Sequence, residues 1–152
     1  MNRRVSVRPF HFALAMALAG AAGLAQAIEF RSVATPALLY DSPSDKGKRI
    51  FIAAPGTPVE VVVTLDKWIK VRDASGQITW IASDKLSAKR TLQVTAERAV
   101  VRSQPAEAAT PVFEVVRNVL LDLAEPPAAG WVKVRHAGGA SGYLRVSEVW
   151  GL

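Results

Sequence analysis

A short pattern, Trp-x-Lys-x-Arg, occurs twice in the chain and brings together residue types that can recognise a ligand. An indole ring offers a flat apolar platform, and neighbouring ammonium and guanidinium groups can hold a carboxylate or a peptide carbonyl. Side chains alternate along a strand, so each copy would display its indole and both cations on one face. The candidate binding residues are Trp68, Lys70 and Arg72 in the first copy and Trp131, Lys133 and Arg135 in the second.

Side chains suited to catalysis are scarce by comparison. The chain has no cysteine, and His136 is the one histidine after residue 27, in a predicted hairpin turn without an obvious carboxylate to orient it. Two carboxylates could serve a glycosidase, but most of the acids stand where solvated strand or loop charges are expected. The acids considered are Glu60, Asp66, Glu114, Asp122 and Glu125. We therefore predict a protein that is not an enzyme and that binds no cofactor and no metal.

The two copies of the pattern belong to a longer internal repeat. Residues 68–81 (WIKVRDASGQITWI) and 131–144 (WVKVRHAGGASGYL) are identical at six of fourteen positions, at a constant offset of 63. A second match, from ALLYDSP to AVVRSQP at an offset of 62, places Tyr40 and Arg102 at equivalent loop-entry positions, where either could add to a binding groove. Matching order, spacing and turn residues indicate a duplicated domain.

Each unit must position these residues with short β strands. Segments rich in Val, Ile, Thr and aromatic residues, separated by turn residues, predict strands and no long helix. The predicted strands of the first unit span residues 30–35, 38–40, 49–53, 59–65, 67–72 and 77–82. Those of the second unit span residues 91–96, 99–102, 112–116, 119–124, 131–135 and 141–146. The aliphatic residues of each hairpin should face the interior and the indoles the outside, because so small a core cannot spare its aliphatics.

Two connecting segments carry further predictions. The EPPAAG segment, residues 125–130, is predicted as a hairpin loop stiffened by its two prolines. Residues 87–91 form a short linker with no Gly or Pro run, so the two units should touch rather than swing freely.

The first 27 residues have the composition of an export signal. Three arginines precede an apolar run from Phe10 to Ala25, and Ala25-Gln26-Ala27 supplies the small residues that a signal peptidase requires. We expect a leader helix that is cleaved after Ala27, no stable membrane span thereafter, and a location in the periplasm or outside the cell. A retained anchor is the alternative, although the apolar run of 16 residues is shorter than the about 20 that a spanning helix needs.

Charge argues against nucleic acid as a partner. The formal net charge is +6, yet three of the 19 basic residues and none of the 13 acidic ones lie in the predicted leader. The remaining charge of +3 indicates no nucleic-acid-binding stripe. Export and this small charge both count against an oligonucleotide-binding barrel, a fold that also uses short strands and aromatic residues.

The motifs of the second unit resemble those of a known family. The runs Val-Arg-Ser-x-Pro, Trp-x-Lys-Val-Arg and Gly-x-x-Gly-Tyr-Leu are similar to the bacterial SH3 (SH3b) domain, and the first unit resembles it more loosely. The resemblance implies an all-β chain of two tandem SH3-like small β-barrels behind the signal-peptide helix. The expected organisation is a signal peptide at 1–27, one SH3-like domain at 28–88 and a second at 91–152.

The resemblance also implies a function. SH3-type domains take extended peptides on aromatic-lined grooves. An exported chain of this kind is expected to be a non-enzymatic binding or adaptor protein of the bacterial envelope. Its ligand would be a peptidoglycan stem peptide or an extended segment of another envelope protein. The alternative is a structural scaffold, in which two rigidly docked barrels serve a partner complex by shape and have no small-ligand groove.

Overall fold

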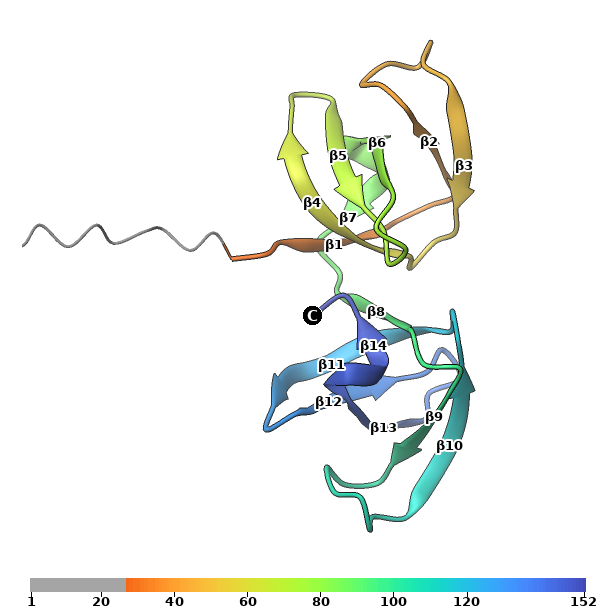
Figure 1. The fold of residues 1–152 in the computed structure, drawn as a ribbon, viewed down its shortest axis with the longest axis vertical. Helices are drawn as coiled ribbons and strands as arrows, with labels where there is room; N and C mark the ends of the chain where they lie inside the picture. Colours follow the sequence, from red (N-terminus) through yellow and green to blue (C-terminus); the bar gives the residue numbers. More distant parts are fainter. Residues whose placement is uncertain (1–26) are drawn as a thin grey trace, which may run out of the picture.

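The computed structural model describes residues 27–152, which form two β-barrels in succession along the chain (Figure 1). The predicted all-β architecture with two pseudo-equivalent halves is confirmed by the identical arrangement of strands in the two barrels. The predicted leader helix lies outside the described residues, which begin at Ala27, the last residue before the predicted cleavage point.

Seven strands make up each barrel. Those of the first are β1 (Phe30–Val33), β2 (Ala37–Tyr40), β3 (Arg49–Ala53), β4 (Pro58–Thr64), β5 (Trp68–Arg72), β6 (Ile78–Ala82) and β7 (Leu86–Ser87). Those of the second are β8 (Thr91–Val94), β9 (Arg98–Arg102), β10 (Pro111–Val116), β11 (Leu120–Ala128), β12 (Trp131–Arg135), β13 (Ser141–Arg145) and β14 (Val149–Trp150). One turn of 3-10 helix precedes the last strand of each barrel, at Ser83–Lys85 and Val146–Glu148.

The strand order is the same in both sheets. It runs β3-β2-β6-β5-β4-β1-β7 in the first barrel and β10-β9-β13-β12-β11-β8-β14 in the second. Every pairing is antiparallel. The central hairpins also share one register, since Trp68 lies opposite Ala82 and Trp131 opposite Arg145. The repeat seen in the sequence is therefore a repeat of backbone pairing.

Alternating aliphatic residues form a separate core in each barrel. Ile69 and Val71 of β5 are fully buried beside Ile81 of β6, and Val132 and Val134 of β12 take the same positions in the second barrel. This confirms that the aliphatic residues of each hairpin point inward. Burying a branched side chain of this kind stabilises the fold by about 1.5–3 kcal/mol, so these residues anchor the strands that carry the two tryptophans.

The predicted loop at residues 125–130 is wrong, because β11 continues to Ala128. Its pairing with β12 shifts register between Glu125, opposite Lys133, and Ala128, opposite Trp131. Pro126 and Pro127 occupy this irregular stretch. A bulge leaves residues out of the ladder, so the missing proline N–H groups cost no hydrogen bond there. The remaining boundaries of the predicted strands agree with the structure to within two residues.

The two barrels touch, as the short linker predicted. Ser32 of β1 and Thr91 of β8 are both buried, and their hydroxyl oxygens lie 2.5 Å apart. The Thr91 hydroxyl also donates to the carbonyl of Gly56 in the first barrel, at 2.7 Å. In Figure 1, β1 and β8 lie where the barrels meet.

Aromatic and charged side chains also pack at this junction between the barrels. The Phe30 ring meets the Trp150 ring edge to face at 5.0 Å, and the Arg90 guanidinium lies 5.5 Å from the Phe30 ring centre. Arg90 also donates a 2.7 Å hydrogen bond to the carbonyl of Gly151. These contacts join the first strand of one barrel to the last strand of the other, so the junction depends on both ends of the described chain.

Candidate functional site

The first barrel presents two of the predicted binding residues side by side. Trp68 begins β5 and Tyr40 ends β2, and their rings meet edge to face with centres 5.4 Å apart. Trp68 is half-buried because its strand is anchored by the fully buried Ile69 and Val71 while the indole points to the other face. The pair therefore forms an aromatic surface with one edge open to solvent.

A hollow of about 520 Å³ lies beside Trp68. Two segments frame the indole: the loop after β2 contributes Asp45, and the end of β6 with the following turn contributes Ala82 and Asp84. The full lining is Pro43, Ser44, Asp45, Lys67, Trp68, Ala82, Ser83 and Asp84. The hollow thus combines an indole, two carboxylates and one ammonium group.

Internal hydrogen bonds hold the loop that carries Asp45. The Asp41 carboxylate accepts from the backbone N–H of Lys48 at 2.9 Å and from the Ser42 hydroxyl at 3.0 Å. The N–H of Gly47 donates to the carbonyl of Ser44 at 3.1 Å, and a Cβ at Gly47 would lie only 2.5 Å from the Ser42 hydroxyl oxygen. A side chain at Gly47 would need the Ser42 hydroxyl to move, and Asp45 lies within this folded loop.

The two cations predicted to join Trp68 lie elsewhere. Lys70 pairs across the sheet with Trp80, and its ammonium group lies 5.1 Å from the centre of that ring. Arg72 binds the Glu60 carboxylate at 3.2 Å. The structure therefore groups Trp68 with Tyr40 but not with Lys70 or Arg72.

The charges that do line the hollow were missed at the sequence level. Asp45 and Asp84 lie far from Trp68 in the chain, and neither belongs to the repeated phrase. A signal was available, however. Counting back from the hairpin turn after Arg72 gives the register that places Trp68 opposite Ala82, next to the segment that carries Asp84.

In the second barrel the equivalent indole is covered. Trp131 is only 8% exposed, and the Arg145 guanidinium lies over its ring, 4.8 Å from the centre. Arg145 is in turn paired with Glu107. Arg102, the other predicted residue here, lies 3.9 Å from the Glu107 carboxylate and donates to the carbonyl of Ala109 at 3.0 Å.

The other two predicted cations of the second barrel, Lys133 and Arg135, have different surroundings. Lys133 binds Glu125 at 2.6 Å, and its ammonium group lies 5.8 Å from the Tyr143 ring centre. The hydrogen bond and the charge of Glu125 raise the pKa of Lys133 above its ordinary value. Arg135 is exposed at the end of β12, opposite Ser141. The second barrel therefore brings Trp131 and Arg102 together only at a smaller hollow of about 210 Å³, which Arg145 and Glu107 also line, and Lys133 and Arg135 are not part of that lining.

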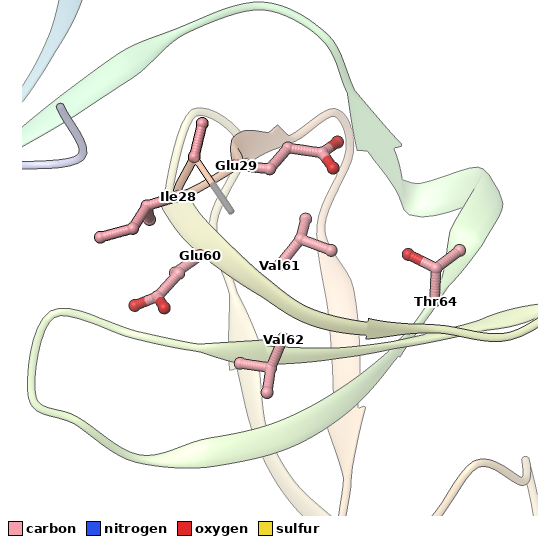
Figure 2. A pocket seen from close by; sticks show the side chains of 7 residues that line it. Ile28, Glu29, Glu60, Val61, Val62 and Thr64 are labelled. Atoms are coloured by element: carbon pink, nitrogen blue, oxygen red, sulfur yellow. The ribbon is translucent and has the colours of Figure 1, made fainter. Parts of the chain in front are cut away.

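A second hollow of the first barrel, of about 500 Å³, lies beside β4 (Figure 2). Figure 2 shows Glu29 and Glu60 there together with aliphatic side chains of β4 and the exposed Ile28. Both carboxylates are already bound to arginines: Glu29 to Arg31 at 2.7 Å and Glu60 to Arg72 at 3.2 Å. These acids therefore serve local ion pairs on the barrel surface.

Ion pairing also accounts for three of the other four acids considered for catalysis, all except Asp66. Glu114 binds Arg98 at 2.8 Å, and Glu125 binds Lys133 at 2.6 Å. Asp122 binds Lys89 of the linker at 2.7 Å. Over residues 27–152, the structure contains no cluster of three or more histidine, cysteine or acidic side chains arranged to hold a metal ion.

Two barrels of this topology, one with an aromatic pair beside a polar hollow, define a protein built from small SH3-like modules. The family model for the bacterial SH3 domain matches the chain twice, at residues 33–88 and 95–151. The chain belongs to the bacterial SH3 domain family and carries two tandem copies of that domain.

The solved structures to which the chain is similar include three whose names contain NlpC. NlpC2 and NlpC1 from Trichomonas vaginalis are each 18% identical, with TM-scores of 0.36 and 0.38, and the matches cover 82% and 85% of this chain. An NlpC/P60 family protein from Bacillus cereus is 17% identical, with a TM-score of 0.36 over 80% of this chain. This chain spans 48%, 48% and 56% of those chains, respectively.

A comparison with curated proteins gave no significant match. Among the residues that the structure describes, no helix has the length and apolar character needed to cross a membrane.

Proposed function

We propose that the chain is an exported, non-enzymatic binding or adaptor protein of the bacterial envelope. Its first SH3 domain, at residues 28–88, takes an extended peptide on the surface formed by Trp68 and Tyr40. The peptide is a peptidoglycan stem peptide or an extended segment of another envelope protein. The export signal predicted for residues 1–27 supports a location in the periplasm or beyond it.

One observation carries this proposal: the half-buried Trp68 stands beside Tyr40 at the edge of an open hollow of about 520 Å³. An aromatic pair gives apolar contact at low entropic cost, and polar groups around it fix the orientation of a backbone. The second domain, at residues 91–152, has its equivalent indole covered by Arg145. We assign this domain no peptide-binding surface; separately, it supplies Thr91 and Trp150 to the junction between the barrels.

The junction favours a second candidate function, that of a scaffold. Phe30, Trp150 and Arg90 pack together between the barrels, and Ser32 and Thr91 meet beneath them. Docked barrels of this kind present a fixed shape to a partner complex. A scaffold would work without the hollow beside Trp68, whereas the proposed peptide binding requires it. Variants of Trp68 therefore distinguish the two functions.

Retention on purified sacculi separates the candidates. The chain from Ile28 onward should be retained, and Trp68→Ala should release it because the aromatic platform is lost. Ile78→Ala is the matched control, since Ile78 is an exposed aliphatic residue at the other end of β6. Equal retention of all three proteins would remove Trp68 from the binding surface, and no retention of any would favour an envelope protein or the scaffold function. Crosslinking and pulldown from intact cells would then identify the partner.

A further inference from the structure

We infer that the hollow beside Trp68 recognises a positively charged group, an ammonium or guanidinium on the bound peptide, stacked on the indole and held by Asp45. This inference rests on the proposed function and assigns a ligand chemistry to the same surface. It follows from comparing the hollow with its counterpart in the second barrel.

The second barrel fills the equivalent position with a cation of its own. The Arg145 guanidinium lies 4.8 Å from the centre of the Trp131 ring and is paired with Glu107. Trp131 and Arg145 are cross-strand partners, as are Trp68 and Ala82 in the first barrel. Arg145 therefore occupies the space over the indole that Ala82, with its single methyl group, leaves free.

The anion that holds this internal cation also has a counterpart. Glu107 lies in the loop after β9, and Asp45 lies at the same place in the loop after β2, at the offset of 62 that relates these segments. Asp45 lines the hollow together with Trp68. The first barrel thus keeps the indole and the carboxylate of the arrangement, but Ala82 and Tyr40 stand where Arg145 and Arg102 flank Glu107 in the second barrel.

The charges of the hollow favour the same occupant. Asp84 adds a second carboxylate at a position where the second barrel has Ser147. Lys67 is the one basic residue in the lining, so carboxylates outnumber cations there although the chain as a whole is basic. A cation over an indole face and beside a carboxylate is attracted by both. An anionic ligand group would meet two like charges in the same space.

The shared chemistry is a cation carried on an aliphatic stem or on a peptide terminus. Four probes distinguish the sources: N-acetyl-lysine amide carries a side-chain ammonium, N-acetyl-arginine amide carries a side-chain guanidinium, alanyl-alanine amide carries a terminal ammonium, and N-acetyl-norleucine amide has nearly the size of the first but no charge. The readout is the indole N–H signal of Trp68 in a nitrogen-15 spectrum of the chain from Ile28 onward, assigned with Trp68→Phe.

We expect saturable shifts of the Trp68 signal with at least one of the charged probes and a much weaker response to the norleucine probe. Asp45→Asn should weaken binding of the charged probe by about two- to fivefold, the range expected for loss of one partner of an exposed ion pair. Ala82→Arg should abolish binding, because the new guanidinium would cover Trp68 as Arg145 covers Trp131. Arg145→Ala should create a second responsive indole at Trp131.

The inference would be overturned if no charged probe gave a stronger response than the norleucine probe. Unchanged affinity in Asp45→Asn would also overturn it, and this variant keeps the test valid should Ala82→Arg fail to fold. Failure of the proposed function is distinguishable. If retention on sacculi depends on Trp68 but no cation shifts its signal, only the inference is contradicted. If a cation shifts the signal but the chain neither stays on sacculi nor captures an envelope protein, only the proposed function is contradicted.

Discussion

The two barrels share one topology and one register, yet their equivalent tryptophans face different surroundings. Trp68 borders an open hollow, whereas Trp131 is 8% exposed beneath Arg145. The difference arises at one cross-strand position, which is Ala82 in the first barrel and Arg145 in the second. A duplicated backbone therefore does not imply a duplicated binding surface, because the residue opposite the indole decides whether the platform is free.

The covering of Trp131 does not come from the neighbouring barrel. Arg145 and Glu107 both belong to the same domain as Trp131, and the junction between barrels is built from other residues, chiefly Phe30, Trp150 and Arg90. The contact between the two barrels and the covering of Trp131 are thus separate features. Variants can change the platform of one barrel without changing the contact between the two.

The largest expected effect tests how differently the two indoles are buried. Trp131→Ala should lower the free energy of unfolding by about 3–5 kcal/mol, as truncation of a buried Trp does. Trp68→Ala should cost clearly less, because that side chain is only half-buried and borders an existing hollow. Urea unfolding of both variants provides the measurement, and equal losses would contradict the contrast between an open and a closed platform.

The next effect tests whether the barrels stabilise each other through their aromatic contact. Phe30→Leu keeps an apolar side chain but removes the edge-to-face contact with Trp150, so stability should fall by about 0.5–1.5 kcal/mol beyond any change in buried area. Phe51→Leu, away from the junction, is the control for the substitution itself. The unfolding of the full two-barrel chain is followed in urea. A stability unchanged by Phe30→Leu would show that the contact does not couple the barrels.

A reciprocal exchange sharpens the comparison at the residue that differs. Arg145→Ala should raise the accessibility of Trp131 to acrylamide, and Ala82→Arg should lower that of Trp68. Both are read from fluorescence in chains whose other three tryptophans are changed to Phe. Loss of the Arg145 contact should cost about 0.5–1 kcal/mol, as for a partly exposed cation on an aromatic ring. Unaltered quenching in both variants would mean that another group controls access.

The smallest effect concerns the ion pair that holds Arg145 in place. Glu107→Gln should lower stability by at most about 1 kcal/mol, because the pair is near the surface and half-exposed. Acrylamide quenching of Trp131 should nevertheless rise, since the guanidinium loses one of its anchors. The effect of the substitution should shrink at high salt, where the pair is screened in any case. A salt-independent loss would indicate that Glu107 acts through packing.

Much of the fold was predictable because its signals are local. Alternation at Ile69 and Val71, and again at Val132 and Val134, gave the inward faces of both hairpins. The end of β11 was not predictable from the same signals. Pro126 and Pro127 normally indicate a loop, and only the bulged pairing with β12 allows the strand to continue past them.

The candidate site was predicted in part. Trp68 and Tyr40 meet as expected from their positions, but Lys70 lies over Trp80 and Arg72 binds Glu60. Membership of one strand face was a correct reason to group Trp68, Lys70 and Arg72. It could not show which neighbouring strand or loop each long side chain would reach, and that depends on contacts across the sheet.

The sequence by itself determined the duplication, the strand pattern and the inward aliphatic residues, because these follow from spacing and side-chain alternation within short segments. The tertiary structure decided which indole is open. The residue directly across the sheet from the indole is Ala82 in the first barrel and Arg145 in the second. A loop carboxylate lies at equivalent places in the two barrels, Asp45 in the first and Glu107 in the second. Residues distant in the chain meet only after the barrel closes, and their meeting sets the chemistry of its surface.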